Sequence, residues 1–316
     1  MRLEWDEKAR PEGIAAARLV RSERHGAALA ARKPAPNLLV AGDNAPVAVA
    51  LVERGYRPRL IYGDPPFATG ADFGDYNDMW AAPDAYMQML FERLVIFHRL
   101  LADDGAMFIH LDWRAAPHAR LLLDEIFGRG AFRNEIVWSY RRWPAKSRAF
   151  QRLHDTLLFY VKDPDNYTWN QLYEPLSPGT LRTHGTRKQQ AVFDGKRRVN
   201  SIDTAETSPG SPMTDVWQIS VINARAKERN GYATQKPEAL LERIIRATTD
   251  PGDLVADLFC GSGTTPAVAQ RLGRRWVGCD ASPRAIALTR DRLLALGAEF
   301  EVLVEDAAVL PGATCS

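Results

Sequence analysis

The stretch DLVADLFCGSGTT, residues Asp253–Thr265, places an apolar run directly before two closely spaced glycines. A short apolar run of this kind is typical of a strand buried in a sheet. Gly261 and Gly263 let the backbone turn sharply and approach a ligand closely. Because a helix is expected next, over residues 266–272, the stretch predicts a strand, a glycine loop and a helix in succession. This succession is typical of α/β sheets that bind nucleotides.

A second strand is expected at Arg274–Asp280, RRWVGCD, and it ends in an acid. Asp280 lies seventeen residues beyond Gly263, close to the separation at which an acid binds ribose hydroxyls. The alternative, that the glycines only form a tight turn, leaves this acid unexplained. The loop has neither the GxGxxG pattern nor the lysine of a triphosphate loop, so a nucleoside without a pyrophosphate fits better. S-adenosylmethionine meets that description.

The residues expected to bind this cofactor surround the two glycines and the acid. They are Asp257, Phe259, Gly261, Ser262, Gly263, Thr264, Thr265 and Asp280. Among them, Phe259, Thr264 and Thr265 favour a nucleoside over a ligand that bears a pyrophosphate.

Short apolar strands alternate with helical segments along most of the chain, which predicts an α/β fold with a Rossmann-like sheet and helices on both faces. Strands are expected at Asn37–Asn44, Arg59–Phe67, Ala106–Asp112, Glu135–Tyr140 and Thr156–Lys162, and helices at Pro46–Gly55, Asp84–Leu101, Ala115–Phe127 and Glu238–Thr249. Residues 37–42 and 300–306 compete for the place beside the cofactor strands, and the sequence leaves this open.

The pattern divides the chain into four parts. Residues 1–36 are rich in Ala and Arg and predict a helical extension. Residues 37–140 form the first half of the α/β domain, and residues 231–316 form the half with the glycine loop. Residues 141–230 are polar, basic and interrupted by Pro, Gly and Ser, so they are interpreted as an insertion, although the strand at 156–162 is assigned to the core sheet.

The insertion carries a local excess of positive charge. Between Arg141 and Asn200 there are twelve Arg and Lys residues against five Asp and Glu residues. The candidate DNA-binding residues are Arg141, Arg142, Lys146, Arg148, Arg187, Lys188, Lys196, Arg197 and Arg198. Aromatic residues lie among these charges, as in surfaces that contact phosphates, but a solvated insertion explains the charge equally well.

Composition is that of an ordinary globular protein. The 316 residues carry a formal net charge of only +2, so affinity for nucleic acid has to come from local clusters of charge. Cys260, Cys279 and Cys315 form neither a disulfide framework nor a zinc spacing, so no metal is expected and a reducing cytoplasm fits best. The charged N-terminus does not resemble a signal peptide, and no run approaches membrane-spanning length.

The stretch LIYGDPPFATG, Leu60–Gly70, ends a strand with an acid, two prolines and an aromatic residue. Proline has no N–H for a sheet ladder and fixes its own φ, so the pair ends the strand abruptly. Asp64 is left at the strand tip beside a stiff backbone with carbonyl acceptors, and Phe67 adds a flat apolar face. These groups suit a planar ligand that bears an amino group.

Four motifs and the insertion follow one another along the chain: DPPF (Asp64–Phe67), the basic insertion, TQKP (Thr234–Pro237), FCGSGTT (Phe259–Thr265) and GCD (Gly278–Asp280). In this order the chain resembles the beta group of the amino-directed DNA methyltransferases, from about Asn37 to Leu294. It is also similar to the longer modification subunits of type III restriction systems, and the resemblance extends to NLLVAGDN, EIVW, HDTLLFYVK and the YND of Tyr76–Asp78. The resemblance implies a methyltransferase sheet with a circularly permuted motif order, in which residues 141–230 recognise the target.

The resemblance also implies roles for the tetrapeptide. Asp64 would accept one N–H of an exocyclic amine and the carbonyl of Pro65 the other, which aims the nitrogen lone pair at the sulfonium methyl group. Pro66 completes the stiff segment, and Phe67 would stack on a base flipped out of the duplex. The family usually has Tyr where this chain has Phe67, which keeps the stacking face without the hydroxyl. The alternative role for Asp64 is that of a turn or cap acid.

Four further residues have two interpretations each. Asp43 would contact the cofactor adenine or lie near it, or it is an ordinary loop acid after a strand. Lys236 and Pro237 match a cofactor-side motif near the methionine end, or they simply precede a helix. Trp80 could line the base pocket, although the core is favoured. His110, in contrast, lies on a strand whose end should face the pocket.

The implied activity is transfer of a methyl group from S-adenosylmethionine to the N6 amine of adenine in duplex DNA. The N4 amine of cytosine is the nearest alternative, but cytosine enzymes more often carry serine at the position of Asp64. The motif order and the basic insertion argue against an RNA or a protein substrate. Intact Asp64, Gly261, Gly263 and Asp280 argue against a DNA-binding protein without catalysis.

Double-stranded DNA in a bacterial or archaeal cytoplasm, at the nucleoid, is therefore the expected partner. Many members of the family are dimers, but the sequence leaves a homodimer and a cognate restriction endonuclease equally open. The recognition sequence is open as well, because residues 141–230 contain no recognisable groove-reading motif.

Overall fold

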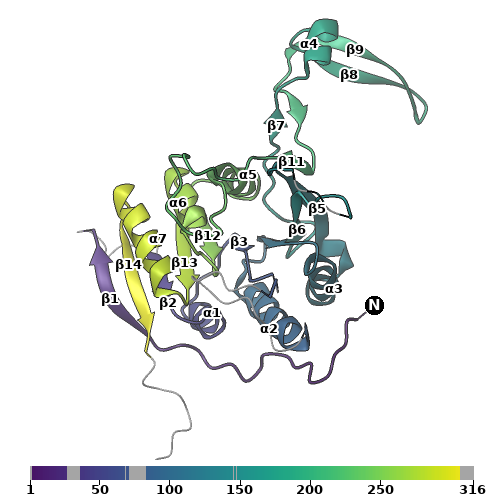
Figure 1. Cartoon of the computed structure of the whole chain (residues 1–316). Coiled ribbons are helices and arrows are strands. Elements are labelled where there is room, and N and C mark those ends of the chain that lie inside the picture. Colours follow the sequence, from purple (N-terminus) through teal and green to yellow (C-terminus); the bar gives the residue numbers. More distant parts are fainter. Residues whose placement is uncertain are drawn as a thin grey trace, which may run out of the picture. The chain divides into compact units, whose positions relative to one another are not determined.

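The computed structural model describes residues 2–26, 36–67, 69–70, 83–144, 146 and 148–306. The chain separates into two compact units, a larger one from residues 1–169 and 215–316 and a smaller one over Asn170–Thr214. The larger unit is an α/β sheet with its helices, and the smaller unit consists of short strands and one helix (Figure 1).

The larger unit is built on one mixed sheet. Ten strands are found among the described residues, in the order β1 (Leu19–His25), β14 (Phe300–Glu305), β2 (Asn37–Ala41), β13 (Arg275–Asp280), β12 (Leu254–Asp257), β3 (Leu60–Gly63), β4 (Ala106–Leu111), β6 (His154–Val161), β5 (Phe132–Ser139) and β11 (Val216–Gln218). The strands from β14 to β4 are parallel. Every residue of β12, β3 and β4 is buried, as expected for parallel strands covered on both faces.

The covering helices are α1 (Asn44–Glu53), α2 (Pro83–Leu100), α3 (Ala116–Phe127), α5 (Glu238–Thr248), α6 (Thr264–Arg271) and α7 (Pro283–Ala295). Helices α1, α2 and α3 pack side by side as one group, and α5, α6 and α7 as another (Figure 1). A 3-10 turn, η2 (Arg129–Ala131), leads into β5. Among the described residues, no helix combines the length and the apolarity that a membrane span requires.

The two helix groups lie on opposite faces because the chain crosses the sheet in two directions. From β2 through β3 to β4 it moves one way, and from β12 through β13 to β14 it moves the other way. Right-handed crossovers therefore place α1 and α2 on one face and α6 and α7 on the other. The predicted Rossmann-like sheet is confirmed. Strands β3 and β12 are neighbours at the reversal, and doubly wound sheets bind their ligands at such a point.

Strand β2 fills the place beside the cofactor strands, which the sequence left open. Leu38–Ala41 pair in parallel with Val277–Asp280 of β13. Strand β14 pairs with the other side of β2. Residues 37–42 therefore adjoin the glycine-loop half of the sheet, and residues 300–306 lie one strand further out.

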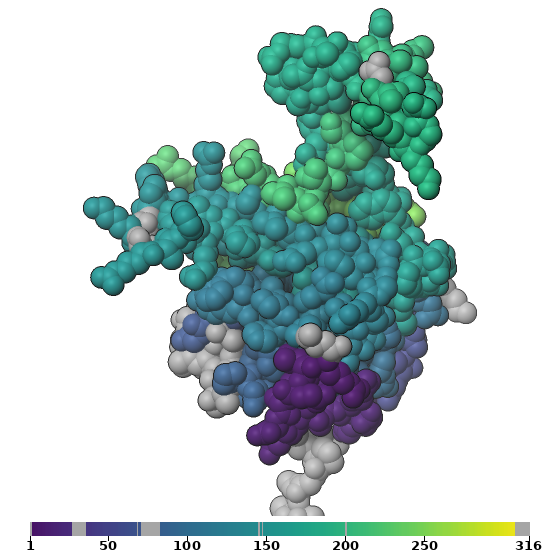
Figure 2. Space-filling view, turned by 90° about the vertical axis from the view of Figure 1, so that its right-hand side faces the viewer, coloured from purple at the N-terminus to yellow at the C-terminus, as the bar shows by residue number. Residues whose placement is uncertain are grey.

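Of the predicted helical extension over residues 1–36, residues 27–35, just before the expected end of the helix, lie outside the described residues. Residues 2–26 contain no helix; they are irregular up to β1, which pairs antiparallel with β14 at the edge of the sheet. The sequence did not predict β1, because the strand is held by a sheet edge that exists only in the folded protein. Before β1, Lys8 Nζ lies 2.8 Å from Glu125 Oε2 of α3, and the Trp5 ring packs edge-on against Phe91 of α2. Figure 2 shows this purple segment lying on the face formed by the blue residues.

The smaller unit is shorter than the predicted insertion. Asn170–Thr214 contains β7 (Tyr173–Glu174), α4 (Pro178–His184), the hairpin β8 (Arg187–Asp194) and β9 (Arg197–Thr207), and β10 (Ser211–Pro212). This unit covers only part of residues 141–230, because β6 and β11 on either side of it in the sequence belong to the main sheet. The assignment of the strand at 156–162 to the core sheet is confirmed by β6.

Candidate active site

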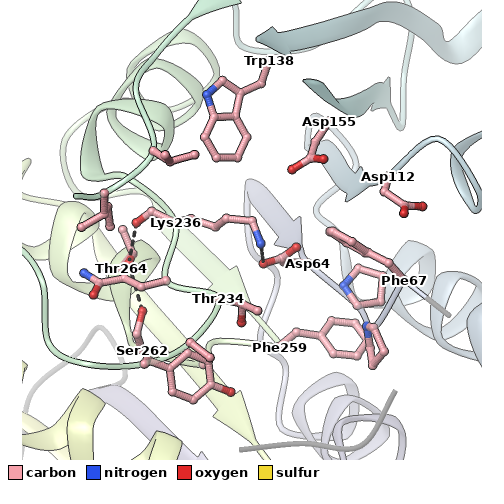
Figure 3. A pocket seen from close by; sticks show the side chains of 18 of the residues that line it. Asp64, Phe67, Asp112, Trp138, Asp155, Thr234, Lys236, Phe259, Ser262 and Thr264 are labelled. Carbon is pink, nitrogen blue, oxygen red and sulfur yellow. Dashed lines mark hydrogen bonds and ion pairs between the residues drawn. The ribbon is translucent and has the colours of Figure 1, made fainter. Parts of the chain in front are cut away.

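A cleft of about 1700 Å³ opens in the larger unit beside the carboxyl ends of β3 and β12. Figure 3 shows it from close by, with Asp64 and Phe67 near Phe259, and Ser262 and Thr264 further along. The residues predicted from the sequence that line it are Asp43, Asp64, Pro65, Pro66, Phe67, Arg141, Arg142, Lys236, Asp257, Phe259, Gly261, Ser262, Thr264, Thr265 and Asp280. The fold thus brings the DPPF segment and the glycine loop, far apart in sequence, to one cleft.

The glycine loop is fixed to the acid that ends β13. Asp280 accepts hydrogen bonds from the backbone N–H of Gly261 at 2.8 Å and of Ser282 at 2.9 Å. Burial raises the pKa of Asp280, and these N–H donors oppose that rise. Gly263 has a φ of +73° and serves the turn itself, because it does not line the cleft. The loop therefore depends on Asp280 for its shape.

A second acid, Asp257, ends β12 beneath the loop and is 3% exposed. It accepts hydrogen bonds from the Thr265 hydroxyl and, at 3.0 Å, from the backbone N–H of Phe259. Burial raises the pKa of Asp257 to about 7, although both donors act in the other direction. A carboxyl group that titrates near neutrality thus lies on the floor of the cleft.

Asp64 follows β3 directly and presents two different oxygens. Oδ2 forms an ion pair with the ammonium group of Lys236, drawn as a dashed line in Figure 3. Oδ1 is buried and has no hydrogen-bond partner within the described part of the chain. His110 Nδ1 lies 3.8 Å from Oδ1. The side chains of Asp64 and Lys236 are only 16% and 13% exposed, so this pair is largely shielded from water.

A buried hydrogen-bonded network supports Asp64 from behind. The Tyr62 hydroxyl lies 2.8 Å from His110 Nδ1, and His110 Nε2 lies 3.3 Å from Asp155 Oδ2. Burial raises the pKa of Tyr62 well above its ordinary value, so its hydroxyl keeps its proton and can donate it to Nδ1. Nε2 is then the imidazole nitrogen that donates to Asp155. Tyr140 donates a further bond to Asp155 at 3.1 Å.

Asp155 is held as an anion by this network. Burial by itself would raise the pKa of Asp155, but the hydrogen bond from His110, the charge of Lys236 and the bond from Tyr140 lower it below its usual value. Asp155 and Asp64 therefore form an acidic pair with His110 between them.

Aromatic rings surround the same point. The His110 ring lies 5.8 Å from that of Phe67 and 5.4 Å from that of Trp138. Trp138 also contacts Tyr140, with ring centroids 5.1 Å apart. Phe67, Trp138 and Tyr140 all line the cleft. The cleft therefore offers flat apolar surfaces next to a carboxylate, as a planar ligand with an amino group requires.

Three predicted cofactor residues have other or additional structural roles. Asp43 lines the cleft, but it caps α1 through the N–H of Ala45 at 3.0 Å and pairs with Arg93 at 3.0 Å. The backbone carbonyl of Lys236 accepts a bond from Thr264 at 3.1 Å. Pro237 lies just before α5 and does not line the cleft.

The candidate DNA-binding residues fall into two groups. Arg141 and Arg142 line the cleft, and Lys146 and Arg148 lie exposed on the same loop, where the Trp143 side chain is 93% exposed. The other five belong to the hairpin of the smaller unit: Arg187, Lys188, Lys196, Arg197 and Arg198. Of these, Lys188 is already paired with Glu206 at 2.6 Å.

Sequence reasoning missed several residues of the site. Tyr62, Trp138, Tyr140, Asp155 and Tyr232 line the cleft. Tyr62, Trp138 and Asp155 lie in the segments LIYGDPPFATG, EIVW and HDTLLFYVK, but the sequence alone assigns no role to them. His110 lies behind the cleft rather than on its wall, and it contacts Tyr62 and Asp155, which do line the cleft. The YND of Tyr76–Asp78 and Trp80 lie outside the described residues.

The doubly wound sheet, the glycine loop with its strand-end acid and the acidic tip of the neighbouring strand define an enzyme of the Rossmann-like class that binds a nucleoside. The family model for DNA methylases of the N6/N4 type matches residues 59–291. This chain belongs to that family of DNA methyltransferases.

Individual relatives agree with this membership. The chain is 32% identical to the DNA adenine methyltransferase YhdJ of Escherichia coli (strain K12) over 235 residues, which cover 74% of this chain and 75% of that protein. It is 29% identical to the type II methyltransferase M.EcaI of Enterobacter cloacae over 305 residues, 78% of this chain and 67% of that protein.

Two solved structures share the fold. The complex of M1.HpyAVI with SAM has a TM-score of 0.55 at 19% identity and covers 81% of this chain and 98% of its own. The cytosine-N4-specific PvuII DNA methyltransferase has a TM-score of 0.54 at 18% identity, with 87% and 88% covered.

Proposed function

We propose that this protein transfers a methyl group from S-adenosylmethionine to the N6 amine of adenine in duplex DNA. The observation that carries the proposal is the position of the Asp64 carboxylate, which shares one cleft with the glycine loop and Asp280. An acceptor for an amine and a site for a nucleoside are the two parts that this reaction requires. The adenine target is supported by Asp at position 64 and by the name of the E. coli relative.

S-adenosylmethionine fits the residues of the glycine-loop side. Asp280 accepts hydrogen bonds from the backbone N–H groups of Gly261, Ser282 and Ala281, and the two oxygens of a carboxylate have about four acceptor positions, which leaves one for a ribose hydroxyl. Phe259 is half-buried at the cleft and offers a ring face. Gly261, with a φ of +48°, holds the backbone in a conformation that a side chain would strain. When bound, the cofactor supplies an electrophilic sulfonium methyl group.

Asp64 and the Pro65 carbonyl then act on the amine. The lone pair of an exocyclic amine is delocalised into its ring, so the nitrogen is a poor nucleophile. Two acceptors that each take one N–H draw the nitrogen toward a tetrahedral shape and free its lone pair. The methyl–sulfur bond of the donor would break as the new C–N bond forms, S-adenosylhomocysteine would be the leaving group, and the nitrogen would lose one proton to the Asp64 carboxylate and from there to solvent. Positioning and preorganised charge provide the acceleration.

The base has to leave the duplex to reach this point, at a cost of a few kcal/mol. Phe67 and Trp138 at the cleft would recover part of that cost by stacking. Arg141 and Arg142 at the same cleft would contact the neighbouring phosphates. The hairpin of the smaller unit, over Arg187–Thr207, is proposed to recognise the target, since five of the candidate basic residues lie on it.

Product analysis tests this function directly. A plasmid from a host that expresses the protein should contain N6-methyladenine by mass spectrometry of its nucleosides, and modified-base sequencing should place it in one sequence context. The Asp64→Ala variant should give none while it still binds S-adenosylhomocysteine. N4-methylcytosine in place of methyladenine would select the cytosine reaction, which the fold shared with the PvuII enzyme makes the second candidate. Unmodified plasmid from the wild-type protein would contradict both.

A further inference from the structure

The amine acceptor is already occupied in the described structure. Asp64 Oδ2 is paired with the ammonium group of Lys236, and Oδ1 is buried behind it. An incoming amine can therefore approach only Oδ2, where it competes with the ammonium group of Lys236. A charged ammonium donor binds a carboxylate more strongly than a neutral amine does, so the base alone is a poor competitor for this place.

Lys236 needs another anion before it can leave. Its side chain is 13% exposed, and an unpaired ammonium group in a shielded position is costly. The other acids of the cleft already have partners: Asp43 pairs with Arg93, Asp112 with Arg114, Asp155 with His110 and Tyr140, Asp257 with Thr265, and Asp280 with the N–H groups of the loop. Of these, Asp155 feels the charge of Lys236, but its oxygens are taken by His110 and Tyr140. None of these carboxylates forms an ion pair with Lys236 among the described residues.

The position of Lys236 shows where such an anion can arrive. Its backbone carbonyl accepts a bond from Thr264, the first residue of α6, and its side chain extends from there to Asp64 (Figure 3). Lys236 thus spans the distance between the helix that follows the glycine loop and the tip of β3. The N-terminus of a helix also favours a carboxylate.

We propose that Lys236 is an exchange residue, which holds Asp64 in the empty enzyme and transfers to the carboxylate of the bound cofactor, so that Asp64 becomes free for the amine. This inference rests on the proposed function. Binding of the target base to Asp64 then depends on bound cofactor. By linkage, the affinity for the cofactor depends on whether Asp64 is paired with Lys236. An enzyme built this way does not hold an extruded base before the methyl donor is present.

Titration calorimetry with two ligands tests the exchange without DNA. S-adenosylhomocysteine carries the carboxylate, and its decarboxylated analogue lacks it. In the Asp64→Asn variant Lys236 has lost its competing partner. The ratio of the affinity for S-adenosylhomocysteine to the affinity for the analogue should therefore be at least about fivefold higher than in the wild type. In the Lys236→Met variant the preference for S-adenosylhomocysteine over the analogue should disappear.

The matched control is Asp112→Asn, which removes a negative charge from the same cleft but from an acid paired with Arg114. It should leave the ratio of the two affinities within twofold of wild type. An equal effect of Asp64→Asn on both ligands, or an unchanged preference in Lys236→Met, would overturn the exchange while the proposed function stands. Failure of the wild type to bind either ligand would overturn both.

A crystal structure gives a second readout. With S-adenosylhomocysteine bound, Lys236 Nζ should lie within hydrogen-bond distance of the ligand carboxylate and no longer on Asp64. With the decarboxylated analogue bound, the Lys236–Asp64 pair should persist. Lys236 on Asp64 in both complexes would rule out the exchange.

Discussion

His110 Nε2 lies 3.3 Å from Asp155 Oδ2, and the whole imidazole is inaccessible to solvent. The other ring nitrogen is bonded to Tyr62 and faces Asp64 at 3.8 Å. The histidine therefore fixes two strands and the adjoining carboxylate with one rigid ring. It is a positioning residue, since Asp64 rather than His110 lines the cleft.

Replacement of His110 should separate positioning from binding. His110→Phe keeps a ring but leaves Tyr62 and Asp155 without their partner, which should cost about 2–4 kcal/mol of unfolding free energy. A shift of Asp64 should lower kcat about 10- to 100-fold, while the dissociation constant of S-adenosylhomocysteine stays within twofold. Urea denaturation and single-turnover kinetics measure the two effects.

The control for this prediction is His110→Gln, whose amide can still bond to one of the two partners. It should recover part of kcat and part of the stability. If His110→Phe loses stability but keeps the wild-type kcat, the residue is only a structural part of the sheet.

Asp257 should make stability depend on pH near neutrality. Its pKa of about 7 lies above the value of an unfolded aspartate, so the folded state binds the proton more tightly. The stability contributed by the neutral form is complete below about pH 4 and is lost as pH rises through 7. Asp257→Asn mimics the neutral form and should lack this loss.

Denaturation at pH 5 and pH 8 measures the effect. The unfolding free energy of the wild type relative to Asp257→Asn should fall by a few kcal/mol between the two values, since one pKa unit corresponds to about 1.4 kcal/mol. A constant difference between the two proteins would show that Asp257 is ionised throughout this range.

The sequence predicted most of the sheet and the motif-bearing part of the site. The runs at β12, β3 and β4 are apolar because both faces are buried, so their pattern is visible without the fold. Asp64, Gly261 and Asp280 are recognisable because strand-end acids and paired glycines have few structural uses. The observed helix limits are also close to the predicted ones, because the apolar pattern of a helix is local. For example, the helix expected at Ala115–Phe127 is α3 at Ala116–Phe127.

What the sequence did not predict depends on contacts between distant segments. Asp155 is one acid among many until β6 places it beside His110 of β4. Strand β1 was not predicted, because it is held by the edge of β14, which exists only in the folded sheet. The smaller unit begins at Asn170 rather than 141, because the polar loop before β6 belongs to the larger unit. None of these features has a local signature.

Gly263 should be the glycine of the loop that tolerates a side chain least. Its φ is +73°, and a Cβ added there would lie 2.6 Å from Thr289 Oγ1, a hydroxyl already bonded to the carbonyl of Gly261 at 2.9 Å. Gly263→Ala therefore combines backbone strain with a clash in the loop. We expect a loss of about 2–4 kcal/mol in unfolding free energy and weaker binding of S-adenosylhomocysteine.

Gly297→Ala is the matched comparison for this loop variant. Gly297 has a similar φ of +65°, but a Cβ there would meet no atom within 4 Å. Gly297→Ala should lose only the unfolding free energy that backbone strain costs, about 1–2 kcal/mol, and should bind S-adenosylhomocysteine like the wild type. Equal losses in the two variants would show that Thr289 moves aside and that the loop is not tightly constrained.

Arg141 and Arg142 should account for part of the salt dependence of DNA binding. Both line the cleft, and each phosphate contact releases counterions in proportion to the charge neutralised. In the double variant Arg141→Gln with Arg142→Gln, the slope of log K against log salt should become shallower by about 1.8, or about 0.9 for each phosphate. Fluorescence anisotropy with a labelled duplex at several salt concentrations gives this slope.

Arg57→Gln is the control, because Arg57 precedes β3 at the opposite end of the strand from the cleft and should leave the slope unchanged. An unchanged slope in the double variant would mean that the basic loop after β5 is a solvated surface rather than a DNA contact.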